Sequence, residues 1–95
     1  MVALQSIEGL IDEVCWYHYD MPNDVLYLRL ASKMGAQTCA EETEDGYLLL
    51  RDMATEEVAG VTIVNWWKRF GKGALPDSLA LLQRAIQPWA KKVAA

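Results

Sequence analysis

The segment Tyr19-Asp20-Met21-Pro22-Asn23-Asp24-Val25-Leu26-Tyr27 is the most informative part of this 95-residue chain. Aromatic and apolar residues on both sides of it favour strands, whereas Pro22 and Asn23 favour a tight turn. The segment therefore predicts an antiparallel hairpin, with one strand over Cys15 to Tyr19 and the next over Val25 to Leu30.

Two further apolar runs follow polar turns. Tyr47 to Arg51 comes directly after Asp45-Gly46, a strong turn dipeptide, and Val58 to Asn65 completes the set. Gly60 inside the last run indicates a bulge or a close approach of another backbone. The residues from Ser32 to Glu44 are mainly polar and predict a connection between strands.

Helical spacing is found at both ends of the chain. Four apolar residues spaced three, four and three apart predict a short helix over about residues 4–12, weakened by one glycine: Leu4, Ile7, Ile11 and Val14, with Gly9. A second helix is predicted over 76–94, with Asp77 or Ser78 as its cap. Its apolar stripe comprises Leu79, Leu82, Ile86, Trp89 and Val93. Pro88 should kink or end it near Gln87.

Together these elements predict one α+β domain over residues 1–95. We expect a four-stranded antiparallel β-meander over 16–65, packed against the C-terminal helix, and a short N-terminal helix. The strands carry apolar residues on both faces, whereas an antiparallel sheet commonly leaves one face polar. We therefore expect the helix to cover one face and something else to cover part of the other.

Composition adds a second reason to expect a partner. Hydrophobic residues make up 53% of the chain and include four Trp, more than a small monomer needs to bury. Residues 1–65 carry twelve acidic against three basic residues, whereas residues 66–95 carry six basic against one acidic. The basic end either packs near the acidic half or contacts a nucleic acid, an anionic membrane or an acidic protein.

The sequence also gives expectations about location. No apolar run is long enough to span a bilayer, and the first residues do not resemble a signal peptide. Two cysteines in such a chain favour reduced thiols over a disulfide. We expect a bacterial, cytoplasmic protein that does not act in a membrane.

The residues from about 16 to 65 resemble the bacterial family called domain of unknown function 2283. The resemblance rests on five matching pieces: Tyr19-Asp20, Asp24, Leu26-Tyr27-Leu28, Tyr47 to Leu50 after an acidic stretch, and Gly60-Val61-Thr62-Ile63-Val64. Thr62 stands where members often carry Glu. The resemblance implies a compact four-stranded antiparallel sheet with helical packing and no established activity. Some relatives look like partners of small toxins, so an antitoxin-like role is an alternative.

Candidate catalytic and metal-binding residues are few. Asp20 and Asp24 flank a turn, where carboxylates typically accept backbone N–H bonds. Cys15 and His18 have zinc-like spacing, but positions three apart on a strand point to opposite faces. Cys39 with His18 as a nucleophile–base pair lacks a third, orienting group. We therefore predict no enzyme activity, no cofactor and no metal, with a small hydrolase or metal protein as the remaining alternative.

The segment 66–72 is the predicted interaction site. It places aromatic residues beside bases: Trp66, Trp67, Lys68, Arg69, Phe70 and Lys72. Such a mixture suits a protein interface, can stack nucleobases and contact phosphates, or can simply pack in the core with a lysine reaching solvent.

Our leading expectation is a non-catalytic protein-interaction or self-assembly module that forms a homodimer or joins a larger complex. The alternative is nucleic-acid binding through a basic set: Lys68, Arg69, Lys72, Lys91 and Lys92.

Overall fold

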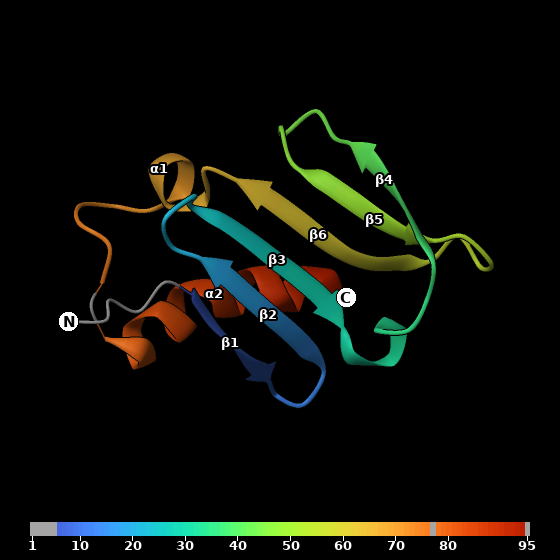
Figure 1. The fold of residues 1–95 in the computed structure, drawn as a ribbon, viewed down its shortest axis with the longest axis horizontal. Helices are drawn as coiled ribbons and strands as arrows, with labels where there is room; N and C mark the ends of the chain where they lie inside the picture. The colour runs from blue at the N-terminus through green and yellow to red at the C-terminus, as the bar shows by residue number, and fades with distance from the viewer. Residues whose placement is uncertain (1–5, 77, 95) are drawn as a thin grey trace.

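A six-stranded antiparallel sheet forms the frame of the computed structural model, which describes residues 6–76 and 78–94. The strands are β1 (Ser6–Ile11), β2 (Cys15–Asp20), β3 (Val25–Leu30), β4 (Thr38–Glu42), β5 (Leu48–Asp52) and β6 (Val58–Val64). They lie in the order β1-β2-β3-β6-β5-β4 (Figure 1), so β3 and β6 form the centre of the sheet. A 3-10 turn (Ala31–Lys33) and the helices α1 (Trp66–Phe70) and α2 (Leu79–Ala94) complete the fold.

The α+β class, the antiparallel sheet and the C-terminal helix are as predicted, but the sheet has six strands rather than four. The predicted N-terminal helix is wrong over the described part of residues 4–12, where β1 pairs with β2. Ile7 and Ile11 share a strand face as readily as a helix face, and Gly9 between them faces the Tyr17 ring. Asp12 and Glu13 close this hairpin with φ angles of 54° and 58°.

The other additional strand is β4, within the segment predicted as a polar connection. It pairs with β5 at the edge of the sheet, and its residues are mostly exposed. Its sequence therefore lacks the apolar alternation that indicates a strand. Charged residues such as Glu41 and Glu42 are typical of edge strands, where they discourage pairing with another chain.

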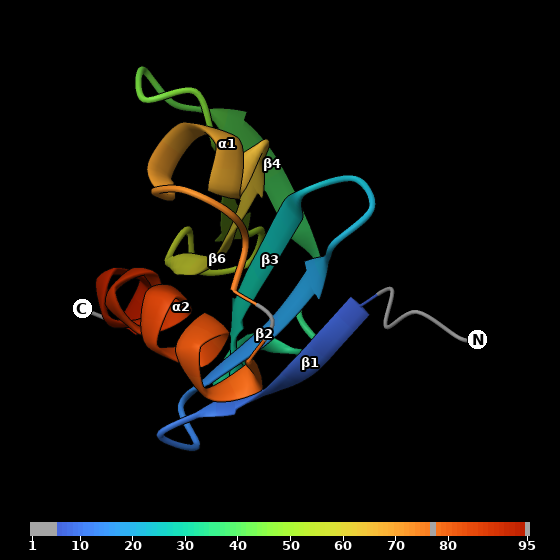
Figure 2. The same ribbon diagram turned by 90° about the vertical axis from the view of Figure 1, so that its left-hand side faces the viewer.

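Both helices lie on the same side of the sheet (Figure 2). Helix α2 contacts the four strands β1, β2, β3 and β6 and buries a core of aromatic and aliphatic side chains against them. The fully buried members include Tyr17, Tyr19, Leu26, Leu28, Ile63 and Ile86. The Tyr17 hydroxyl is also satisfied, because Gln83 Nε2 donates to it at 2.8 Å.

Helix α2 departs from its predicted boundaries and stripe. It begins at Leu79 rather than at 76 and reaches Ala94 as predicted, so of the two predicted effects of Pro88, a kink or an end near Gln87, the end is wrong. Ala90 and Val93 beyond the proline are buried against the sheet. Leu82, Ile86 and Val93 of the predicted stripe are buried, whereas Leu79 is exposed. Ser78 directly precedes the helix, and Asp77, the other candidate cap, lies outside the described residues.

Candidate functional site

The predicted interaction segment begins with a core residue. Residues 66–70 form helix α1, which the sequence analysis did not predict. Trp66 is 2% exposed, and its ring meets Tyr19 edge to face with centroids 5.1 Å apart. Trp66 therefore packs inside the protein, as the core alternative for this segment required.

Asp24 holds helix α1 in place from the turn between β2 and β3. Its two carboxylate oxygens accept the backbone N–H groups of Trp67 at 2.9 Å and Lys68 at 3.0 Å. Asn65 at the start of the helix makes no side-chain cap, so Asp24 supplies one from a distant part of the chain. Asp24 thus accepts backbone N–H bonds as predicted, but from α1 rather than from its own turn.

The same carboxylate organises the adjacent core. The Tyr19 hydroxyl donates to Asp24 Oδ1 at 2.6 Å. Burial raises the pKa of Asp24, but the bond from Tyr19 and the two backbone bonds outweigh it, and the pKa is lowered overall. Burial together with this bond raises the pKa of the Tyr19 hydroxyl. Tyr19 is thus stabilised as the neutral hydroxyl that donates this hydrogen bond, and Asp24 is stabilised as the carboxylate that accepts it.

The remaining residues of segment 66–72 divide into tied and exposed groups. Trp67 Nε1 donates to the Gly73 carbonyl at 2.9 Å, and the Arg69 guanidinium donates to the carbonyls of Gly46 and Asp45. These contacts fasten α1 to the following loop and to the turn before β5. The side chains of Lys68, Phe70 and Lys72 remain exposed.

A row of cationic and aromatic groups joins the two helices. Arg69 Cζ lies 4.8 Å from the centroid of the Phe70 ring, and the ring centroids of Phe70 and Trp89 in α2 are 4.7 Å apart. Lys92 lies 4.6 Å from the same Trp89 ring. Basic residues from the two ends of the C-terminal segment are thus brought onto one surface. This is a geometry that the sequence alone did not indicate.

The candidate catalytic residues do not assemble. Cys15 is buried on the helix side of the sheet, and His18 lies on the opposite face beside Glu8 at 3.6 Å. Burial raises the pKa of the Cys15 thiol. Cys39 is an exposed thiol on the edge strand β4. Within residues 6–76 and 78–94, no three His, Cys, Asp or Glu side chains form a group that could hold a metal.

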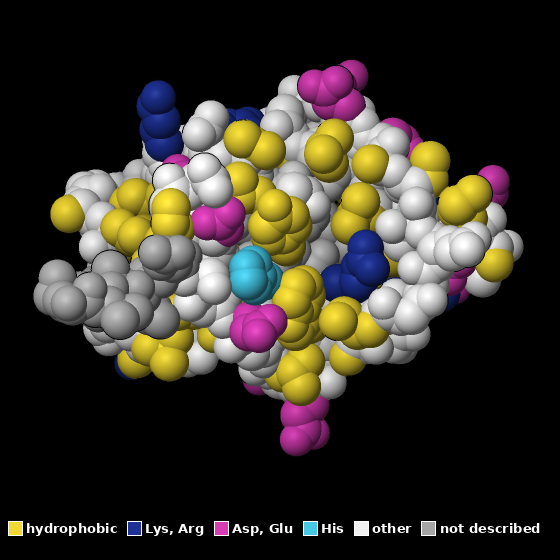
Figure 3. Space-filling view, viewed as in Figure 1, with side chains coloured by type: hydrophobic (Ala, Val, Ile, Leu, Met, Phe, Trp, Pro, Cys, Tyr) yellow, Lys and Arg dark blue, Asp and Glu magenta, His cyan; other side chains and the backbone are white. Residues whose placement is uncertain are grey.

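The most extensive candidate surface is the sheet face opposite the helices, which we call the open face. Across the described ranges, neither helix lies on it, and hydrophobic side chains gather along its middle (Figure 3). Strand register arranges its residues in three rows. The Arg29 row contains Leu10, Trp16, Arg29, Gly60, Leu50 and Ala40. The Tyr27 row contains Glu8, His18, Tyr27, Thr62, Leu48 and Glu42, and the Val25 row contains Ser6, Asp20, Val25 and Val64.

A hollow of about 430 Å³ interrupts the open face over β6. It is lined by Trp16, Tyr27, Leu28, Arg29, Met34, Leu50 and Thr62. Gly60 lies in the same row as three of these residues, between Arg29 and Leu50. A Cβ atom there would lie 2.2 Å from the Leu28 carbonyl oxygen, which confirms the predicted close approach. Because Gly60 has no side chain, nothing from this position fills the space between Arg29 and Leu50.

The charges of the open face are separated along the strands. Arg29 is half-buried, and its Nη2 donates to Thr38 Oγ1 at 3.3 Å. Asp20 lies two rows away and accepts a 2.9 Å hydrogen bond from Asn23. Among residues 6–76 and 78–94, neither side chain takes part in an ion pair. The face therefore carries a cation in one end row and an acid in the other.

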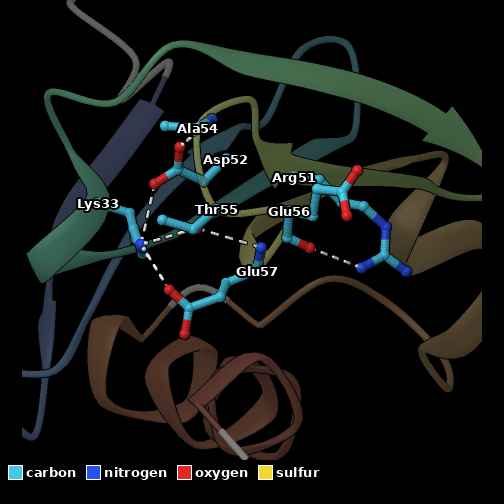
Figure 4. A network of polar contacts seen from close by, with 7 residues as sticks. All are labelled: Lys33, Arg51, Asp52, Ala54, Thr55, Glu56 and Glu57. Carbon is cyan, nitrogen blue, oxygen red and sulfur yellow. Dashed lines mark hydrogen bonds and ion pairs between the residues drawn. The ribbon is translucent and has the colours of Figure 1, made fainter.

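A polar cluster joins the 3-10 turn to the β5–β6 connection (Figure 4). Lys33 Nζ donates to Asp52 at 2.9 Å and to Glu57 at 3.0 Å. The Lys33 ammonium lowers the pKa of both carboxyls, and the Asp52 carboxylate in turn raises the pKa of Lys33. Asp52 is 8% exposed and also accepts the Ala54 N–H. Met34, which lines the hollow, directly follows the turn that this cluster holds.

Sequence reasoning placed the candidate site in 66–72 and expected part of the second sheet face to be covered, but it did not identify the residues that form this face. The signal was the apolar content on both strand faces. Trp16, Tyr27 and Leu50 all alternate with core residues along their strands. Strand order and register were needed to show that they come together.

Within the described ranges, neither helix is long and apolar enough to cross a bilayer. Comparison of the chain with protein-family models, with curated proteins and with solved structures found no match.

Proposed function

We propose that this chain is a non-catalytic protein-interaction module whose contact surface is the open face of the sheet. The observation that carries the proposal is the exposure of apolar side chains on that face: Leu10, Tyr27, Met34 and Val64 are 38–56% exposed. A contiguous apolar surface of this kind is typical of a protein-binding site. Aromatic and Met side chains, together with Arg29, match the residue types enriched in interfaces.

The roles of the reactive side chains support the non-catalytic part of the proposal. Asp24 caps a helix, Cys15 is packed in the core, and Asp52 and Glu57 share the Lys33 ammonium. Each has a structural partner that accounts for its position. Both cysteines are free thiols, in keeping with the reducing, bacterial cytoplasm that we propose as the location.

The test compares tagged wild-type protein with Tyr27→Asp and Leu81→Asp, each purified from the native host at low salt and weighed by native mass spectrometry. Tyr27 is 38% exposed on the open face, and Leu81 is 50% exposed on α2. We expect the wild type and Leu81→Asp to hold a second protein chain, identical or different, in fixed stoichiometry, and Tyr27→Asp to lose it. A bare monomer in all three samples would contradict the proposal.

A second candidate function is nucleic-acid binding, favoured by the row from Arg69 through Phe70 and Trp89 to Lys92. Stacked rings with adjacent cations can hold bases and phosphates of a single strand. If this function holds, an oligonucleotide probe should bind with an affinity that falls as salt rises, and Lys68→Glu with Lys92→Glu should weaken it. Absence of binding at low salt would reject it.

A further inference from the structure

The hollow and the exposed Val64 side chain lie toward opposite ends of the same strands. Arg29 and Leu50 line the hollow, and Gly60, which has no side chain, lies between them in the Arg29 row. Two rows away on the same central strands, Val25 and Val64 are register partners, and Val64 is 47% exposed. One end of the β3–β6 pair therefore borders the hollow, and the other end presents an exposed apolar side chain.

A twofold axis can relate two copies of the chain so that the hollow of one copy faces the exposed Val64 end of the other. If the axis lies between two stacked sheets and runs along the Tyr27 row, it exchanges the Arg29 row of one copy with the Val25 row of the other. Val64 of one copy then lies over the Gly60 hollow of its partner, and each copy contributes one projection and one recess. Such self-complementarity is what an isologous interface requires.

The charges of the face agree with the same axis. Arg29 and Asp20 lie on neighbouring strands in opposite end rows, so they are too far apart to pair within one chain. The axis places Arg29 of one copy within one strand spacing, about 5 Å sideways, of Asp20 in the other. Glu8 and Glu42 end the row on the axis, and both are exposed at the rim, where solvent screens their repulsion.

The size of the face is sufficient for such an interface. Six strands spaced by about 4.8 Å and about six residues long cover roughly 500 Å² in projection. Two copies therefore bury roughly 1,000 Å² before the relief of their side chains is counted, which is the lower bound for a specific interface. Stacked sheets about 10 Å apart leave space for the side chains of both faces to interdigitate.

We infer that the occupant of the open face is a second copy of this chain, stacked face to face about a twofold axis, with Val64 of each copy seated in the Gly60 hollow of the other. This inference rests on the proposed docking function and names its partner. The resulting homodimer would be a sandwich of two six-stranded sheets with the α2 helices on its outer sides.

The first test measures the dimer dissociation constant of the full chain by analytical ultracentrifugation over a dilution series. Val64→Lys should raise this constant by about 30-fold or more, because it places a second cation beside Arg29, which lines the hollow. Leu81→Lys is the matched control, since Leu81 is 50% exposed but belongs to α2 on the other side of the sheet. It should leave the constant unchanged. Circular dichroism establishes that each variant is folded.

The second test checks the axis through its charges. Arg29→Asp alone and Asp20→Arg alone each place like charges together and should weaken the dimer by about tenfold. The double variant restores opposite charges across the axis, so its dissociation constant should return to within about threefold of the wild type. This recovery does not depend on the behaviour of Val64→Lys.

Three results would overturn the inference. These are a wild type that stays monomeric at about 100 µM, a dimer weakened by Leu81→Lys but not by Val64→Lys, and a double charge variant no stronger than its single variants. A monomeric wild type that nevertheless loses a different protein partner in Tyr27→Asp would reject the second copy and leave the docking function intact. The two proposals can therefore fail separately.

Discussion

The Asp24 carboxylate lies 2.9 Å from the backbone nitrogen of Trp67, although 43 positions separate the two residues in the chain. The turn between β2 and β3 thereby supplies the cap of a helix that begins beyond β6. Because Val25 at the start of β3 pairs with Val64 at the end of β6, the β2–β3 turn and the start of α1 meet at the same end of the central strands. Formation of α1 consequently depends on the central strand pair being in register.

Replacing Asp24 should destabilise the protein more than replacing a comparable turn acid. Asp24→Asn keeps the side-chain size and tolerates the residue's φ of 54°, but it removes the charge that receives two backbone bonds. We expect the free energy of unfolding in urea to fall by about 1–2 kcal/mol. Asp12→Asn is the control, because Asp12 has the same φ, is exposed and makes no side-chain hydrogen bond with the described residues. Equal losses in the two variants would contradict the capping role.

The contribution of the Asp24 carboxylate to stability should also be visible in the pH dependence of the free energy of unfolding. The pKa of Asp24 is lowered in the folded state, so its contribution to stability is complete above the unfolded value and is lost as the pH falls through the folded value. Asp52 and Glu57 add contributions of the same sign. Urea unfolding from pH 7 to 2 should show constant stability down to about pH 5, followed by a decline below about pH 4. The decline should be shallower in Asp24→Asn, and parallel curves for both proteins would count against this origin.

The sequence predicted the elements that carry their own local signals. Strands β2, β3, β5 and β6 are short runs rich in apolar residues with recognisable turn signals beside them, and α2 has a helical stripe. β1 was missed because its spacing suits a helix as well as a strand. Its turn uses Asp12 and Glu13 at positive φ in place of the usual glycine. β4 was missed because an edge strand needs little apolar surface.

Features that depend on distant partners could not be predicted. Helix α1 has no cap of its own, and Asp24 is remote in sequence. The open face exists because three rows align across six strands, and no single strand reveals this alignment. The burial of Trp66 in segment 66–72 likewise follows from the fold rather than from the segment itself.

Within α1, side-chain replacements should separate packing from surface roles. Trp66→Leu removes a 2% exposed ring that meets Tyr19 and should lower the free energy of unfolding by about 2–4 kcal/mol. Lys68→Ala two positions later changes an exposed side chain and should cost less than about 0.5 kcal/mol. Urea unfolding at one protein concentration measures both. A near-neutral Trp66→Leu would indicate that the ring is not part of the core.

Gly60 should resist replacement because the atoms that a side chain would meet there belong to the backbone of the neighbouring strand. A Cβ at this position would lie 2.2 Å from the Leu28 carbonyl and 3.1 Å from the Arg29 Cα, and both atoms belong to the neighbouring central strand. Gly60→Ala must therefore push β3 and β6 apart, and we expect a loss of about 2–3 kcal/mol in urea unfolding. Gly35→Ala is the matched control, because a Cβ at Gly35 would have no neighbouring atom of the described residues within 4 Å. It should be neutral or slightly stabilising, since alanine restricts the unfolded chain. If Gly60→Ala were tolerated as well as Gly35→Ala, the close approach of β3 and β6 would be wrong.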